Sequence, residues 1–462
     1  MLIATWIITC VAIVGAGVLV GRNIQKSNQW TGSDQTLSAT GLAAVYAGFQ
    51  IGGMAIVGAA QGGYTGGMTG IWFSVAGACY FFTVALTAKI MRRIPDASLA
   101  VYLENRFGKA PSRFYSYTWV LYTFFYIPFQ LLTVSSVIKI AIPNMNTNLA
   151  MIVGVSLAVL YTGFSGIKGT AVVGRIVAYG VYILLIGFLF ITVNKHFDGF
   201  GGLFASVPAE YANPFNMPIQ RIVAYVVGGC LGTGIMQTIL QPMLATKDVK
   251  SVYKGCLMAY LFAGPICLIT ATIGIIAKAS GAELGDGATA FAWTIQQYTS
   301  PWLAGVIFAV VTIIISATMA AMMLGAGTIM ANIYKADFNP KADDKKVLKF
   351  AKYSTFAFAY LSVLPAIALK LDNLVSPFLT LQHVVAGPMF FSLFFGLLWK
   401  GATKQGSFWS LVSGMGIGVI WMLLDLTAKV EAIYPVIIVS CVVGYTVSKL
   451  TANKDTALQA EK

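Results

Sequence analysis

Two glycine-rich stretches are the residues whose types and spacing most clearly suggest a binding site. They include Gly48, Gly52, Gly53, Gly58, Gly228, Gly229, Gly232 and Gly234. Because glycine has no side chain, such clusters allow a helix to unwind and leave backbone carbonyl oxygens free. Free carbonyls that line a site inside a membrane can bind a cation. Close packing between helices is the alternative interpretation of the same glycines.

His383 is a second candidate for chemistry, because it lies in the middle of an apolar segment. An ionisable group at such a depth in a membrane is a functional hypothesis by default. Histidine is also the side chain whose reference pKa lies nearest neutrality. We therefore predict a possible proton site at His383. A neutral imidazole that is hydrogen-bonded between helices is the alternative.

The composition tells what kind of elements must position these residues. Of the 462 residues, 58% are hydrophobic and 10% are charged, whereas about 25% are charged in a soluble domain. This predicts an all-α integral membrane protein and excludes a soluble enzyme, a DNA-binding protein and a disordered scaffold. The net charge of +14 is explained by basic cytoplasmic loops, so no nucleic acid partner is expected. Six cysteines occur singly, so neither a disulfide framework nor a metal site is predicted.

A helix that spans a bilayer needs about 20 mostly apolar residues. On this basis the sequence predicts about 13 transmembrane helices, at residues 2–22, 40–62, 66–88, 114–138, 149–167, 176–194, 220–244, 253–277, 302–334, 350–370, 374–399, 406–424 and 432–449. The odd number places the two termini on opposite sides. With the N-terminus outside, 24 of the 30 basic residues lie at inside ends, and the others are Lys139, Lys195, Arg221, Lys278, Lys370 and Lys429. This distribution predicts a cytoplasmic C-terminus.

The two glycine clusters lie five predicted helices apart, on helices that run in opposite directions. They predict a 5+5 inverted repeat in which each half opens on an interrupted helix, the second and the seventh of the chain. The predicted domain is a single membrane domain over 1–450, followed by a short tail at 451–462. Its core repeats cover about 40–194 and 220–399, and the helices at 2–22, 406–424 and 432–449 are peripheral. All 16 acidic residues fall near helix ends or in loops, so no buried carboxylate relay is expected.

Five segments of the chain resemble motifs of the sodium:solute symporter family. They are GAAQGGYTGGMTGIW at 58–72, YTGFSG at 161–166, QTILQPMLATK at 237–247, the segment from Ser316 to Lys335, and GLLWKGATKQG at 396–406. The resemblance extends from the first helix to about residue 425. It implies a LeuT-type inverted-repeat core with extra peripheral helices. Members of this family take up solutes such as proline, pantothenate, sugars and carboxylates.

The resemblance also implies a sodium site next to the first interrupted helix. Its ligands would be the carbonyl oxygens of Gly48, Ile51 and Ile313 and the hydroxyl of Ser316, but Ala317 lacks the second hydroxyl of the family. Thr318 lies about 200° around a helix from Ser316, so we expect that it does not replace this hydroxyl. Sodium, the coupling ion that the resemblance implies, should therefore bind weakly. A hydrogen bond from Ser316 to its own i−4 carbonyl is the alternative role.

The solute site is expected beside this ion site, at the membrane midplane between the interrupted helices. Its candidates are uncharged polar side chains of the second, fourth and seventh helices: Gln50, Gln61, Tyr122, Tyr126, Gln130, Gln237 and Gln241. A glutamine in lipid needs hydrogen-bond partners, so each must face protein or water. Hydrogen bonding between helices is the alternative role for each of them.

The sequence therefore predicts a secondary active transporter in the cell membrane that imports a small polar organic solute by alternating access. Sodium coupling follows from the resemblance, and a proton-coupled or uncoupled carrier on the same fold is the alternative. A transporter-like membrane sensor is a further alternative, for which a signalling domain after the last helix would be expected. Nothing resembles a nucleophile–base pair, a Walker loop or a metal set, so neither an enzyme nor a cofactor is predicted. The solute and the oligomeric state are left open.

Overall fold

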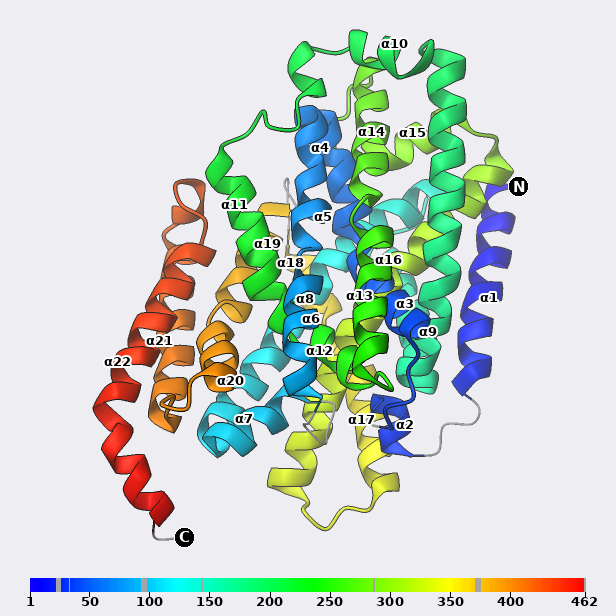
Figure 1. Cartoon of the computed structure of the whole chain (residues 1–462). Coiled ribbons are helices and arrows are strands. Elements are labelled where there is room, and N and C mark those ends of the chain that lie inside the picture. Colours follow the sequence, from blue (N-terminus) through cyan, green and yellow to red (C-terminus); the bar gives the residue numbers. More distant parts are fainter. Residues whose placement is uncertain are drawn as a thin grey trace.

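The computed structural model describes residues 1–21, 26–32, 34–92, 98–142, 144–285, 287–369 and 375–460. Four basic residues that the predicted orientation uses lie outside these ranges: Arg22, Arg93, Lys370 and Lys462. Figure 1 shows helices that run mostly between two ends of the molecule, with α10 at one end and α17 near the other. Among the described residues the only β-type pairing is an isolated bridge between Leu37 and Thr246. The predicted all-α class is confirmed.

The helices follow one another along the whole chain. Their bounds are α1 (Leu2–Gly21), α2 (Ser27–Thr31), α3 (Ala39–Gln50), η1 (Met54–Gly58), α4 (Ala59–Gly66), η2 (Gly67–Ile71), α5 (Trp72–Gly77), α6 (Tyr80–Met91), α7 (Leu99–Phe107), α8 (Lys109–Ala141), α9 (Thr147–His196), α10 (Gly199–Ala205), η3 (Ala209–Ala212), α11 (Ile219–Val227), η4 (Gly228–Gly232), η5 (Thr233–Ile235), α12 (Gln237–Leu244), α13 (Val249–Ala263), α14 (Ile266–Ala279), α15 (Ala290–Tyr298), α16 (Pro301–Ile333), η6 (Tyr334–Phe338), α17 (Asp344–Leu361), α18 (Val363–Ala368), α19 (Val375–Ala386), η7 (Phe391–Phe395), α20 (Gly396–Leu398), α21 (Lys404–Leu423), η8 (Leu426–Ala428) and α22 (Ile433–Ala460).

Nine helices of the described chain are long and apolar enough to cross a membrane, and a tenth is the bent pair formed by Ile219–Gly232 and Gln237–Leu244. The number 13 stays a prediction. Three predicted helices account for the difference. Residues Met54–Met91 count as one continuous apolar stretch, and the apolar helix Thr147–Leu160 is shorter than a full span. The predicted helix 350–370 falls on α17 and α18, which are not among these spans. The predicted repeat boundaries likewise stay predictions, and the helix α22 continues through much of the predicted tail, as far as Ala460.

The second predicted helix is interrupted between α3 and η1, where the glycines predict a break. Ser38 caps the start of α3 by accepting a hydrogen bond from the backbone N–H of Gly41. The helix ends at Gln50, because Ile51 has φ −83° and ψ 57°. After Gly53 the chain resumes as a π-helical turn, η1, and continues into α4.

The seventh predicted helix is interrupted in a comparable way. The segment α11 passes into the π-helical turn η4 and the 3-10 turn η5. Met236 then adopts an extended conformation with φ −75° and ψ 147° before α12 begins. The two parts of this span are bent by 49°.

The label α9 covers two helices that meet at a kink at Gly166, with φ 52° and ψ −141°, where the sequence predicts the separate helices 149–167 and 176–194. A positive φ favours glycine, and the backbone and ring of Trp30 leave no room for a Cβ at this position. The predicted helix 253–277 is divided into α13 and α14, where Pro265 lies at the join. The short helices α7, α10 and α15 lie in segments that were predicted as loops.

The helix α16 forms the centre of the molecule. In its most apolar window 94% of the residues are buried, and it packs against α1, α3, α8, α9 and α12. A helix that is apolar on all sides is stable only when it is surrounded by other elements. It therefore provides the fixed wall against which the first interrupted helix lies.

Candidate functional site

A buried cavity lies between the two interrupted helices. The first interrupted helix contributes α3 and η1 to its lining, the second contributes α11, η4 and η5, and the remaining walls are α5, α8, α16 and α19. The lining residues are Phe49, Gln50, Gly52, Met54, Ala55, Phe73, Gly77, Tyr126, Gln130, Tyr225, Gly228, Gly229, Thr233, Thr318, Phe378, Leu379, Gln382 and His383. No Asp, Glu, Lys or Arg is among these described lining residues. The volume of the cavity is about 40 Å³, which is room for about three water molecules.

The carbonyl end of the first interruption is bonded to α16. The hydroxyl of Thr318 donates hydrogen bonds to the backbone oxygens of Gly48, at 3.0 Å, and Phe49, at 3.1 Å. These oxygens belong to the last turn of α3, which has no helical N–H to bind them. Gly52 lies directly beside this contact, and a Cβ at position 52 would collide with the Thr318 hydroxyl.

The N–H end of the same interruption is bonded to α8. The backbone nitrogen of Gly53 donates to Oε1 of Gln130 at 3.0 Å. A Cβ on Gly53 would collide with Thr133, one turn along the same helix. Both glycines of the break are therefore required for close approach of the backbone to two buried side chains.

Ser316 lies on another side of α16. Its hydroxyl donates to the carbonyl oxygen of Thr312 at 2.9 Å, which is the i−4 contact, and lies 3.3 Å from the carbonyl oxygen of Gly154 in α9. Ala317 lies nearer to the break, with its Cβ 3.6 Å from the position that a Cβ of Gly48 would take. Ile51 and Ile313 are both fully buried.

The second interruption is bonded through Thr233 and two glutamines. Gln382 of α19 donates from Nε2 to the hydroxyl of Thr233, and this hydroxyl lies 3.4 Å from the carbonyl oxygen of Gly228. Below the break, Oε1 of Gln237 accepts from the backbone N–H of Leu99 at 2.7 Å. These contacts attach η5 to α19 and α12 to the start of α7.

His383 reaches the same cavity from α19. The side chain is buried, and its Nδ1 has no hydrogen-bond partner among the described residues. Its Nε2 edge lies over Gly228, where a Cβ would collide with the imidazole ring. The titratable side chains that share the cavity with it are Tyr126 of α8 and Tyr225 of α11.

The structure separates the predicted solute residues into two groups. Gln50, Tyr126 and Gln130 line the cavity. The remaining four do not, and they are Gln61, Tyr122, Gln237 and Gln241. Gln241 donates to the carbonyl oxygen of Thr31 at 2.8 Å and to the hydroxyl of Thr328 at 3.0 Å, so it ties α12 to α2 and α16.

Four polar lining residues are not among the predicted site residues: Tyr225, Thr233, Thr318 and Gln382. Gln382 precedes His383, so an intramembrane polar pair could have drawn attention to it. The sequence predicts that Thr318 points away from the side of Ser316. The inference about direction holds, but the structure presents Thr318 to the break and turns Ser316 toward α9.

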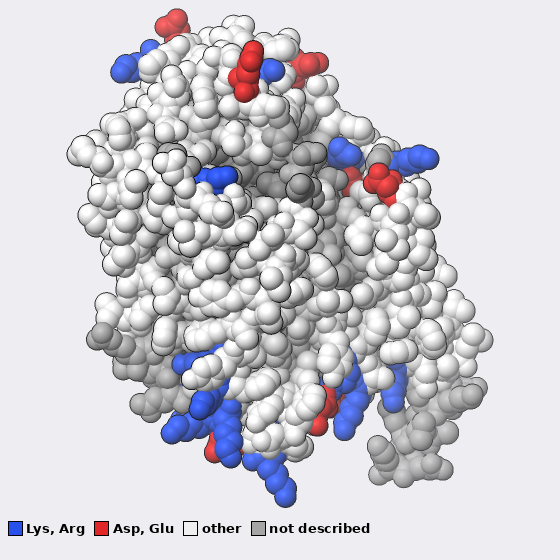
Figure 2. Space-filling view, turned by 180° about the vertical axis from the view of Figure 1, so that it is seen from behind, with Lys and Arg blue, Asp and Glu red and all other residues white. Residues whose placement is uncertain are grey.

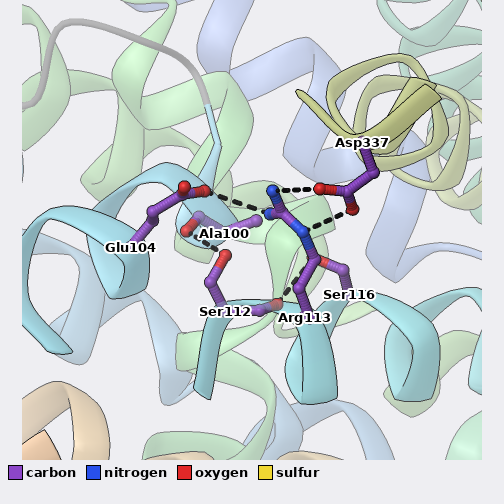
Figure 3. Close-up of polar contacts among 6 residues, drawn as sticks. All are labelled: Ala100, Glu104, Ser112, Arg113, Ser116 and Asp337. Carbon is purple, nitrogen blue, oxygen red and sulfur yellow. Dashed lines mark hydrogen bonds and ion pairs between the residues drawn. The ribbon is translucent and has the colours of Figure 1, made fainter. Parts of the chain in front are cut away.

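An ion-pair cluster lies at the end of the molecule where α7 meets α8. The guanidinium of Arg113 contacts Glu104 of α7 at 3.0 Å and Asp337 of η6 at 2.5 Å. Figure 3 shows Arg113 placed between the two carboxylates, with the hydroxyl of Ser112 directed to the carbonyl oxygen of Ala100. The cluster joins the α7–α8 corner to the end of α16 and lies outside the cavity lining.

Two interrupted helices that enclose one polar cavity inside an apolar helical bundle define a membrane transporter of the LeuT type. The chain belongs to the sodium:solute symporter family, whose sequence profile matches residues 31–414. The family assignment that the motifs implied is confirmed, and with it a transporter rather than an enzyme.

Similar proteins agree with this assignment. The chain is 25% identical over 435 residues to the uncharacterized symporter YwcA of Bacillus subtilis, covering 87% of this chain and 83% of that protein. It is 23% identical to the high-affinity proline transporter PutP of the same organism, covering 86% of each. Among solved structures, a Na⁺-coupled sialic acid symporter superposes with a TM-score of 0.81 at 15% identity, over 97% of this chain and 98% of that one. This last likeness establishes the fold.

Proposed function

We propose that the protein imports a small polar organic solute without net charge by alternating access. The observation that supports this most is the cavity between the interruptions, which contains amide, hydroxyl and imidazole groups but no charged side chain among its described lining residues. A solute with an unpaired charge would have to be desolvated there without a counter-charge, which is strongly unfavourable. The small volume of the cavity favours a compact solute.

The orientation in the cell membrane follows from the basic residues. On the face shown in Figure 2, a large group of Lys and Arg side chains lies at the lower end of the molecule with a few acidic side chains among them, and the upper end has both signs of charge. The positive-inside rule makes the lower end cytoplasmic. The N-terminus of α1 would then face outside and α22 would end in the cytoplasm (Figure 1).

Sodium is the coupling ion that membership of the family suggests. A proton is the second candidate, and it is favoured by one observation: Nδ1 of His383 is buried at the cavity with no partner among the described residues. Tyr126 and Tyr225 are the other titratable groups of the lining, and no carboxylate of the described lining faces the imidazole. Protonation of His383 would therefore introduce the one positive charge of this site.

The proposal is tested by the thermal stabilisation of purified protein, because a bound solute raises the unfolding midpoint by mass action. A panel should contain neutral amides, polyols and zwitterions, each with an anionic analogue of matched size. We expect stabilisation by a neutral or zwitterionic compound and none by its anionic analogue. Gln50→Leu, which changes the cavity lining, should abolish the stabilisation. Gln61→Leu, on the same interrupted helix but outside the lining, should retain it.

A further inference from the structure

The carbonyl end of a broken membrane helix needs a positively charged or hydrogen-donating partner. The last carbonyl oxygens of α3 have no intrahelical N–H, and the end of a helix carries a partial negative charge. In hydrocarbon surroundings such groups are strongly destabilising when they are left without partners. A cation is one solution, and a donated hydrogen bond is another.

The residues at this break do not fit a cation site. A hard cation requires several oxygen ligands with free lone pairs. The oxygen of Gly48 already accepts from the Thr318 hydroxyl at 3.0 Å. Ser316 directs its hydroxyl to Thr312 and Gly154 instead, and Ala317 has no side-chain oxygen.

We propose that the hydroxyl of Thr318 takes the place of a coupling sodium ion, holds the break against α16, and makes the protein independent of sodium. One consequence of this proposal is that solute uptake needs no sodium gradient, and only this consequence rests on the proposed transport function. The hydroxyl is a donor in both of its contacts with α3, to Gly48 and to Phe49. Its single proton is shared between these two oxygens and so supplies the partial positive charge that an ion would otherwise bring to the carbonyl end of α3.

Two further contacts show that the break is built around this hydroxyl. A Cβ on Gly52 would collide with the Thr318 hydroxyl, so the backbone approaches the threonine as closely as glycine allows. On the opposite side, Gln130 accepts from the N–H of Gly53 at 3.0 Å. A donor on α16, Thr318, thus binds the carbonyl end of the interruption, and an acceptor on α8, Gln130, binds its N–H end. The interruption is therefore held between α16 and α8.

The experiment compares the thermal unfolding midpoint of the purified full-length protein in NaCl and in KCl at equal ionic strength. The wild-type protein should unfold at the same temperature in both salts. Thr318→Val keeps the shape of the side chain but removes the donor, so its midpoint should fall by several degrees in KCl. Part of this loss should be regained in NaCl, because the two carbonyl oxygens are then free for an ion.

Ser316→Ala is the matched control, because it removes a buried hydroxyl from the same helix away from the break. Its midpoint should change equally in both salts. Thr318→Ser, which keeps the hydroxyl, should behave as the wild-type protein does. The proposal is overturned if sodium specifically stabilises the wild-type protein and Ser316→Ala removes this effect, or if Thr318→Val unfolds at the wild-type temperature in KCl.

If Thr318→Val does not fold, the comparison of wild type and Ser316→Ala in the two salts still tests the proposal. Since no solute is present, a negative result in the solute panel has no bearing on this experiment. Conversely, sodium-specific stabilisation of the wild-type protein that Ser316→Ala removes would overturn the role of Thr318 and leave the proposed solute site unaffected.

Discussion

The side-chain oxygen Oε1 of Gln130 lies 3.0 Å from the backbone nitrogen of Gly53. This contact makes α8 the acceptor for the N–H end of the first interruption, so Gln130 has a structural role in addition to its place in the cavity lining. Residues that hold the break can therefore be distinguished by experiment from residues that only face the solute.

Replacing Gln130 by Met, which has a similar length and no strong acceptor, should destabilise the protein. A buried donor left without its partner costs about 1–3 kcal/mol, and the unfolding midpoint in detergent measures the loss. Tyr126→Phe, one turn away on α8, should change the midpoint much less. Equal losses in the two variants would show that the contact with Gly53 has no particular importance.

Gly52→Ala should abolish solute uptake in proteoliposomes, because its Cβ would meet the Thr318 hydroxyl and displace the break. Gly232→Ala provides the matched control. Its Cβ would meet its nearest neighbour, Cδ1 of Ile433, at 3.8 Å, which is an ordinary contact. Normal uptake by Gly52→Ala would count against a site at the first interruption.

His383→Gln should flatten the dependence of solute uptake on external pH and preserve solute binding, if the imidazole carries the coupled proton. Glutamine retains a polar side chain of comparable size but does not titrate. His196→Gln, at an exposed position at the end of α9, should keep the parent profile. A profile of His383→Gln that overlays the parent profile would assign His383 a purely structural role.

Arg113→Met should lower the unfolding midpoint, since it leaves Glu104 and Asp337 without their shared cation. Hydrogen bonds to charged groups contribute about 1.5–3 kcal/mol each, and partial exposure of this cluster reduces that figure. Lys109→Met, at the exposed start of the same helix, should have little effect. High salt should weaken the difference between the two variants, and a difference that is independent of salt would argue against an electrostatic contribution.

Much of the fold could be predicted from the sequence, because long apolar segments and clustered glycines are properties of local sequence. The position of Gly48, Gly52 and Gly53 is sufficient to predict an interruption, since few residues other than glycine allow the backbone to approach a neighbouring helix so closely. The division of the predicted helix 253–277 at Pro265 also has a signal in the sequence, because a proline inside a helical pattern removes a backbone hydrogen bond.

The details of the site could not be predicted in the same way. The helix α16 is apolar on nearly every side, so no amphipathic pattern indicates its rotation. The sequence therefore could not decide whether Ser316 or Thr318 faces the break. Gln237 is predicted beside the solute, and the sequence does not indicate that its Oε1 accepts from the N–H of Leu99, at the start of a short helix in a segment predicted as a loop. Such contacts depend on tertiary packing rather than on spacing along the chain.

The most direct test of the account is the exchange of a labelled solute across proteoliposome membranes, with a compound that stabilises the purified protein. We predict exchange in potassium medium without sodium. We also predict its loss in Gln382→Leu, which removes the amide that bonds Thr233 at the second interruption, and its retention in Gln61→Leu. Exchange that Gln382→Leu leaves unchanged, or the absence of exchange for every stabilising compound, would contradict a transport site between the two interruptions.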